Sequence, residues 1–140
     1  MTPRQSIQAE CARRGQPALV AGCVALLERR GGVDDGLIVA LSGQVAEYVL
    51  SGREGGRDGY WPRVWAARGL LHAFQPQATA AIITATSDEA WRVREMAAKV
   101  VARYRVGDAL DAVAALRDDP VPRVRAAASR AVTMLTAAGA

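Results

Sequence analysis

The chain has 140 residues, of which 51% are hydrophobic and 23% charged, and this length suits one domain that buries its own core without disulfides or metals. No run approaches the roughly 18 consecutive apolar residues of a membrane span, and the N-terminus lacks a signal peptide's basic and then apolar order, so we expect a cytoplasmic protein that binds no membrane. The net charge of +4 permits an anionic partner without requiring one.

Short breaks rich in Gly, Pro and Asp divide the chain into segments of helical length. Between them we expect eight helices, near residues 4–14, 17–30, 35–51, 60–74, 77–87, 90–105, 108–117 and 121–137. Asp or Ser precedes several of these segments, and such side chains accept hydrogen bonds from the free amides of a first helical turn. β-branched residues never gather into alternating runs, so we predict an all-α fold of antiparallel helical hairpins.

The two cysteines, Cys11 and Cys23, are 12 residues apart, and this spacing matches no zinc or redox motif. We interpret both as reduced, small, buried apolar residues. The abundance of Ala, and of Arg relative to Lys, suggests a GC-rich bacterial genome.

Three segments of the sequence are similar to one another: Trp61–Ala67, Ala90–Ala97 and Val121–Ala128. Each opens a helix with Arg-Val, and the three arginines, Arg63, Arg92 and Arg123, stand 29 and 31 residues apart. A period of this length corresponds to one helical hairpin, so the repeats predict hairpins stacked side by side.

In the last two copies an Asp lies six residues before the Arg that follows the Val. These pairs are Asp88 with Arg94 and Asp119 with Arg125. We interpret them as structural ion pairs that fix the stack, since an Arg can hold a carboxylate through two parallel hydrogen bonds.

This pattern resembles HEAT repeats, in particular the short version of about 30 residues named after phycobilisome lyases. The resemblance is clear over 76–138, weaker over 35–74, and without a motif in 1–34. It implies an α-solenoid whose second helices line a concave face, and it implies no reaction. We therefore expect one domain over 1–140, with an N-terminal hairpin at 1–34 and repeats at 35–74, 76–105 and 107–138.

The first copy departs from the pattern, because Gly59 and Trp65 replace the Asp and the Arg. A Gly-rich insertion at 52–59 lengthens the preceding turn, which predicts a binding edge over 52–65. Trp65 neighbours Arg63 and Arg68, and an exposed Trp beside cations suits the stacking of a base or the anchoring of a partner. The alternative is that Trp65 belongs to the core.

Further candidate binding residues are cations that recur at equivalent places in the repeats. Arg63, Arg92 and Arg123 precede the buried Val and have no acid at a fixed spacing, so we expect them on one surface. Lys99 and Arg130 form another matching pair that extends this surface. The alternative is a solvated charged face without a ligand.

Nothing in the sequence predicts catalysis, a metal or a cofactor. His72 is the only histidine, and it lacks a neighbouring nucleophile with an orienting carboxylate. The Gly-rich 52–59 segment lacks the Lys-Ser/Thr ending of a phosphate-binding loop.

The sequence therefore favours a non-enzymatic scaffold that binds a protein partner through the concave face or the 52–65 edge. The alternative is a nucleic-acid binder allied to HEAT-like DNA glycosylases, in which the repeated cations contact phosphates and Trp65 stacks on a base. The Ala-rich final helix also predicts a homodimer through the C-terminal end.

Overall fold

The computed structural model describes residues 2–42 and 59–137, and throughout these ranges the chain forms helices, turns and loops without any strand. The predicted all-α fold is confirmed. The chain divides into two compact units, Met1–Ala78 (unit 1) and Thr79–Ala140 (unit 2). The expected single domain over 1–140 stays a prediction.

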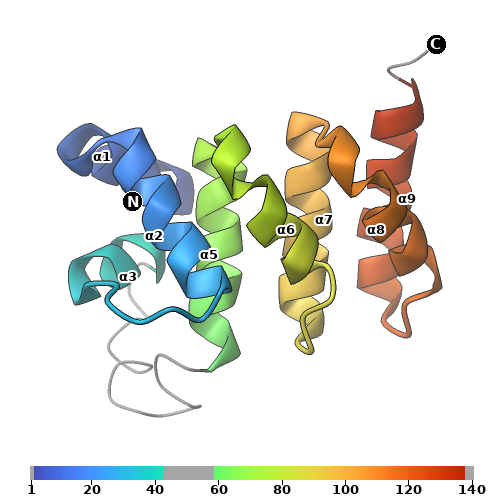
Figure 1. The fold of residues 1–140 in the computed structure, drawn as a ribbon, viewed down its shortest axis with the longest axis horizontal. Helices are drawn as coiled ribbons and strands as arrows, with labels where there is room; N and C mark the ends of the chain where they lie inside the picture. Colours follow the sequence, from blue (N-terminus) through green and yellow to red (C-terminus); the bar gives the residue numbers. More distant parts are fainter. Residues whose placement is uncertain (1, 43–58, 138–140) are drawn as a thin grey trace. The chain divides into compact units, whose positions relative to one another are not determined.

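Unit 1 contains α1, α2, α3 and α5 and a short 3-10 turn (Figure 1). Their bounds are Pro3–Arg14, Gln16–Leu27, Asp35–Ser42, Tyr60–Ala73 and, for the turn, Pro76–Ala78. Thr2 begins α1 with a capping box, in which its side chain and that of Gln5 each accept a backbone amide of the other. Gly15 joins α1 to α2 with φ +91°, a conformation that residues with a side chain rarely adopt.

The core of unit 1 forms where α2 packs against α5, and α3 packs against α1 and α5. Its fully buried side chains include Ile7, Leu19, Val20, Leu37, Ile38, Leu41 and Leu70. The predicted helix over 35–51 is observed as far as Ser42, and the remainder lies outside the described residues.

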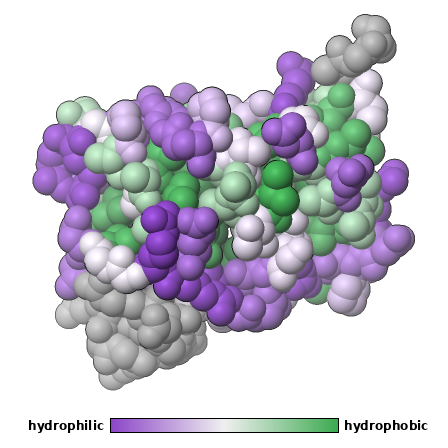
Figure 2. Space-filling view, in the orientation of Figure 1, coloured by the Kyte–Doolittle hydropathy of each residue, from purple (hydrophilic) through white to green (hydrophobic). Residues whose placement is uncertain are grey.

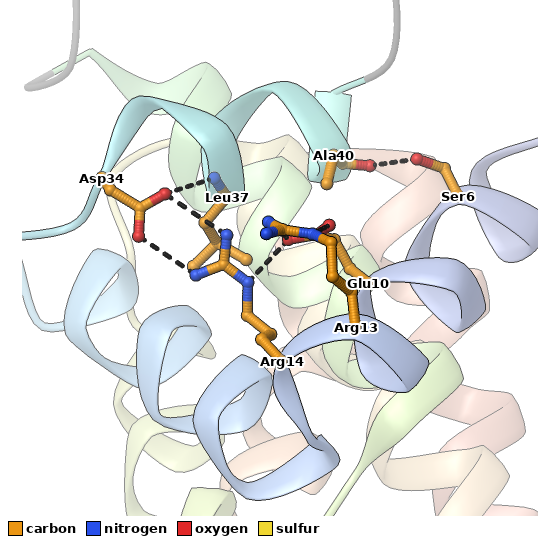
Figure 3. Close-up of polar contacts among 7 residues, drawn as sticks. All are labelled: Ser6, Glu10, Arg13, Arg14, Asp34, Leu37 and Ala40. Atoms are coloured by element: carbon orange, nitrogen blue, oxygen red, sulfur yellow. Dashed lines mark hydrogen bonds and ion pairs between the residues drawn. The ribbon is translucent and has the colours of Figure 1, made fainter.

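A polar cluster ties α1 to the start of α3 (Figure 3). The Arg14 guanidinium donates to Glu10 at 2.6 Å and to both carboxylate oxygens of Asp34 at 3.0 and 3.3 Å. Asp34 also accepts the Leu37 amide at 2.8 Å, which caps α3. Together the Arg14 guanidinium and the Leu37 amide lower the pKa of Asp34 to about 2, so this carboxylate stays ionised over the physiological range.

The two cysteines of unit 1 are free thiols in different surroundings. Cys23 is fully buried, as predicted, whereas Cys11 is half-buried. Burial raises the pKa of Cys23 to about 12 and also raises the pKa of Cys11.

We therefore expect iodoacetamide at pH 8 to alkylate Cys11 slowly in the folded protein and to leave Cys23 intact, because only an accessible thiolate reacts. Mass spectrometry of the digested protein measures both sites, with urea-unfolded protein as the control in which both react. Equal labelling of the two thiols in the folded protein would contradict the burial of Cys23.

The described part of unit 2, residues 79–137, consists of two helical hairpins, α6 with α7 and α8 with α9. The helices span Thr79–Ala85, Trp91–Tyr104, Leu110–Ala115 and Pro122–Ala137, and 3-10 turns at Gly107–Ala109 and Leu116–Asp118 flank α8. The second helices, α7 and α9, pack directly on each other, as the HEAT resemblance implies. Small buried side chains, among them Ala97, Ala98 and Ala128, let the helix backbones approach closely.

Figure 2 shows the molecule in the orientation of Figure 1, in which α6 and α8 face the viewer. Hydrophobic residues gather in the middle of the visible face of unit 2, and hydrophilic residues line its lower edge, where the loops within the hairpins lie.

Candidate binding surface

Arg94 of α7 joins the two hairpins of unit 2. Its Nη1 donates to the backbone oxygens of Asp88 and Glu89, at 2.8 and 3.1 Å, within its own hairpin. Its Nε and Nη2 donate to the two carboxylate oxygens of Asp119, at 2.7 and 3.2 Å, in the following hairpin. The Arg94 guanidinium therefore binds the loop of its own hairpin and, through a bidentate ion pair, the neighbouring hairpin.

Asp119 also caps the helix that follows it, because its Oδ1 accepts the Val121 amide at 2.9 Å. Burial tends to raise the pKa of the Asp119 carboxyl, but hydrogen bonds from Arg94 and Val121 outweigh burial and leave the pKa lowered. The nearly buried Asp119 carboxylate therefore both caps α9 and holds the two hairpins together.

The predicted side-chain pairing of Asp88 with Arg94 and of Asp119 with Arg125 is wrong. Arg125 donates from Nη1 to the backbone oxygen of Asp119 at 2.8 Å, as Arg94 does to that of Asp88, while the Asp88 carboxylate accepts the Ala90 amide. The reason is geometric. The Asp lies at the helix start and the Arg in its first turn, so the Arg reaches the carbonyls of its own loop and has one edge left for the next hairpin.

Trp91, at the start of α7, has two guanidinium groups close to its ring. The guanidinium carbons of Arg92 and Arg123 are 4.4 and 5.3 Å from the centre of its ring. Cations at these distances are attracted by the electron-rich face of an indole. Trp91 is also half-buried and packs against the core cluster that includes Leu116 and Val124. Core packing therefore holds the ring in place, and both guanidinium groups lie within attractive distance of it.

Glu95, one turn further along α7, partly neutralises this basic region. Its side chain is only 9% exposed, yet its carboxylate lies 2.9 Å from Nε of Arg123 and 3.8 Å from Nζ of Lys99. These two cations are themselves 65% and 44% exposed. A buried acid therefore anchors two exposed cations and weakens the positive potential that they present.

Of the predicted binding residues, the structure brings Arg92, Arg123 and Lys99 together around Trp91 and Glu95. Arg130 is exposed on α9, two helical turns beyond Arg123 and hence on the same side of that helix. We call this set the Trp91 surface, which comprises Trp91, Arg92, Lys99, Arg123 and Arg130.

The expected exposed position of Arg63 and Trp65 is wrong. Both lie in unit 1 and are buried, with 4% and 3% of their surfaces exposed. Most of the first three turns of α5 is buried, so Trp65 belongs to the core, where it stacks on Trp61 at 6.3 Å between ring centres. Arg63 donates to the Gly59 oxygen and lines a cavity of about 160 Å³ together with Arg29. Residues 52–58 of the predicted edge lie outside the described part of the chain.

Two residues in or beside the Trp91 surface were not among the predicted binding residues, namely Trp91 and Glu95. Trp91 contacts the core, and the guanidinium groups of Arg92 and Arg123 also lie close to its ring. A signal existed for Glu95, because it stands four residues before Lys99, a helical spacing at which opposite charges meet.

Among residues 2–42 and 59–137, no group of three His, Cys, Asp or Glu side chains is placed to hold a metal ion. Within the same ranges, no helix has both the length and the apolar character needed to span a bilayer.

Stacked hairpins joined by a repeated Asp and Arg arrangement define a helical-repeat protein. A family model described as HEAT repeats matches residues 58–133, which is more than half of the chain. The chain therefore belongs to the HEAT repeat family, and repeats of this family generally mediate protein interactions and scaffolding. No curated protein and no solved structure matches the chain.

Proposed function

We propose that the protein is a non-enzymatic adaptor that binds an acidic protein partner through the Trp91 surface. The observation that carries this proposal is the half-buried Trp91 with the guanidinium groups of Arg92 and Arg123 close to its ring. Trp and Arg are the residue types most enriched where binding energy concentrates in protein interfaces. Because core packing holds the ring in place, little side-chain freedom is lost on binding.

The charge pattern supports a protein partner over nucleic acid. A phosphate chain is best met by cations without acids among them, since each phosphate contact replaces a condensed counterion. Glu95 forms ion pairs with two residues of the Trp91 surface, Arg123 and Lys99. A mixed arrangement of this kind suits a partner with carboxylates at defined positions, which can be matched group by group.

Nucleic-acid binding is the second candidate, and a specific observation supports it. Arg123, Lys99 and Arg130 are exposed on neighbouring helices, and the chain has a net charge of +4. Trp91, in place of the predicted Trp65, would be the stacking residue.

The double variant Arg92→Glu/Arg123→Glu tests the proposal. We expect partner affinity to fall at least about 30-fold, since two contacts at the centre of the interface are reversed in charge. A photo-crosslinking residue at position 99 of the otherwise intact chain, activated in cells of the source organism, should give a protein adduct that the double variant lacks.

The matched control is Arg105→Glu/Arg117→Glu, which makes the same charge change at two exposed positions outside the Trp91 surface and should keep the adduct. Fluorescence anisotropy of labelled single- and double-stranded DNA and RNA at low salt is measured in parallel. Salt-dependent binding that only Arg92→Glu/Arg123→Glu abolishes would establish the second candidate instead. Absence of any adduct at position 99 would refute the protein-binding proposal.

A further inference from the structure

In unit 2, the second hairpin has an exposed face whose equivalent in the first hairpin is buried. Positions in α7 and α9 that are 31 residues apart are equivalent in the repeat. In α7 the small or apolar side chains Ala98, Val101 and Ala102 are buried. Their equivalents in α9, Ser129, Val132 and Thr133, are exposed or half-exposed. We call Arg125, Ala126, Ser129, Val132 and Thr133 the open face.

Arg125 gives the open face a specific polar group. Its Nη1 is held by the backbone oxygens of Asp119 and Pro120 at 2.8 and 3.2 Å, which is the clamp that holds Arg94 in the preceding hairpin. In Arg94 the other edge, Nε and Nη2, binds the Asp119 carboxylate. In Arg125 the same edge has no carboxylate within ion-pair distance among residues 2–42 and 59–137, and the side chain is exposed. The guanidinium is thus oriented for a carboxylate in advance.

We propose that the open face docks a helix of a partner protein that begins with an aspartate cap, whose carboxylate binds the Nε and Nη2 edge of Arg125. The inference rests on the proposed role as a protein-binding adaptor, and it assigns that role a second surface, separate from the Trp91 surface. The ligand chemistry follows from this chain itself, because Asp119 caps α9 and binds Arg94 with the same carboxylate.

Charge distinguishes this occupant from a second copy of the chain. The open face contains a cation and no acid, so two copies that paired through their open faces would bring no carboxylate from those faces to either Arg125. The small, weakly polar side chains beside Arg125 leave room for a close helix, as Ala98 and Ala102 do in α7. The homodimer predicted from the Ala-rich final helix is therefore the competing outcome of the test.

The test uses the ¹⁵N-labelled full chain and, as the probe, a synthetic hairpin of residues 107–137, because this segment covers the equivalent face of α7. We expect the probe to shift the amide resonances of Ala126, Ser129 and Val132 and the Nε resonance of Arg125. Affinity should fall at least tenfold with Arg125→Gln in the chain, and equally with Asp119→Asn in the probe.

A linked form keeps the test decisive if the isolated hairpin is unfolded. A second copy of residues 107–137 placed directly after Ala137 keeps the 31-residue register and should raise the urea midpoint, a gain that Arg125→Gln removes. If the linked copy adds no stability and the probe shifts nothing, the proposal is overturned. It is equally overturned if Arg125→Gln leaves both effects intact, or if light scattering shows that the open face pairs two copies of the chain.

Failure of this proposal is distinguishable from failure of the proposed function. The Arg92→Glu/Arg123→Glu variant changes no residue of the open face, so it should bind the hairpin probe as the wild type does. The Arg125→Gln variant should in turn keep the crosslink at position 99.

Discussion

Replacing Asp119 with alanine is expected to destabilise unit 2 by about 3 kcal/mol, which is a large fraction of the stability of a small domain. The change removes both the cap on the Val121 amide and the carboxylate that neutralises Arg94. The side chains of Arg94 and Asp119 are only 15% and 5% exposed, so a charge left without its partner is poorly compensated by water. Urea unfolding followed by circular dichroism measures the loss.

The same pair predicts a pH dependence with a definite sign. The pKa of Asp119 is lowered in the folded protein, so its contribution to stability is complete above its ordinary pKa of about 3.8. That contribution is lost as the pH falls through the lower, folded value, because the unfolded chain then binds more protons. The stability difference between the wild type and Asp119→Asn should therefore be constant from pH 7 to 5 and should shrink below pH 4.

Asp118→Ala is the matched control, since the neighbouring Asp118 is exposed and its replacement removes the same charge. It should change stability by no more than about 0.5 kcal/mol. Equal losses for the two variants would show that net charge, and not the Arg94 contact, produces the effect.

Replacing Gly69 with valine is expected to destabilise unit 1 by about 3 kcal/mol, because the site has no room for a side chain. A Cβ at Gly69 would lie 2.7 Å from Cδ2 of Leu41 and 2.9 Å from Sγ of Cys23, and both of these side chains are fully buried. Alanine should cost only about 1 kcal/mol, because its better helix propensity offsets part of the overlap.

Cys23→Ala in the Gly69→Ala background removes one of the two overlaps and should recover part of the loss in a double-mutant cycle. Gly107→Ala is the control, since a Cβ at Gly107 meets no atom within 4 Å, and it should leave stability within about 0.5 kcal/mol of the wild type. Additive effects of the Gly69 and Cys23 substitutions would contradict the proposed overlap.

The sequence by itself determined the fold class and most of the helix boundaries. Apolar residues at helical spacing, together with Asp, Gly and Pro at the breaks, act within one or two turns of the chain, and such local signals can be read without tertiary structure. The predicted helix over 90–105 differs from α7 by one residue at each end, and the predicted helix over 121–137 differs from α9 by one residue at its start and ends at the same residue. The repeat likewise predicted stacked hairpins, since a unit of this length cannot bury its apolar face alone.

Only the tertiary structure decided which groups meet. The six-residue spacing predicted a side-chain pair of Asp119 with Arg125. In the structure the Asp119 carboxylate binds Arg94 of the preceding hairpin, and Arg125 binds Asp119 only at its backbone oxygen. Trp65 and Trp91 stand near the starts of equivalent helices, yet Trp65 is buried and Trp91 carries cations on its ring. Burial depends on residues distant in sequence that cover a side chain, and ion pairs depend on how neighbouring helices align, so local spacing contains neither piece of information.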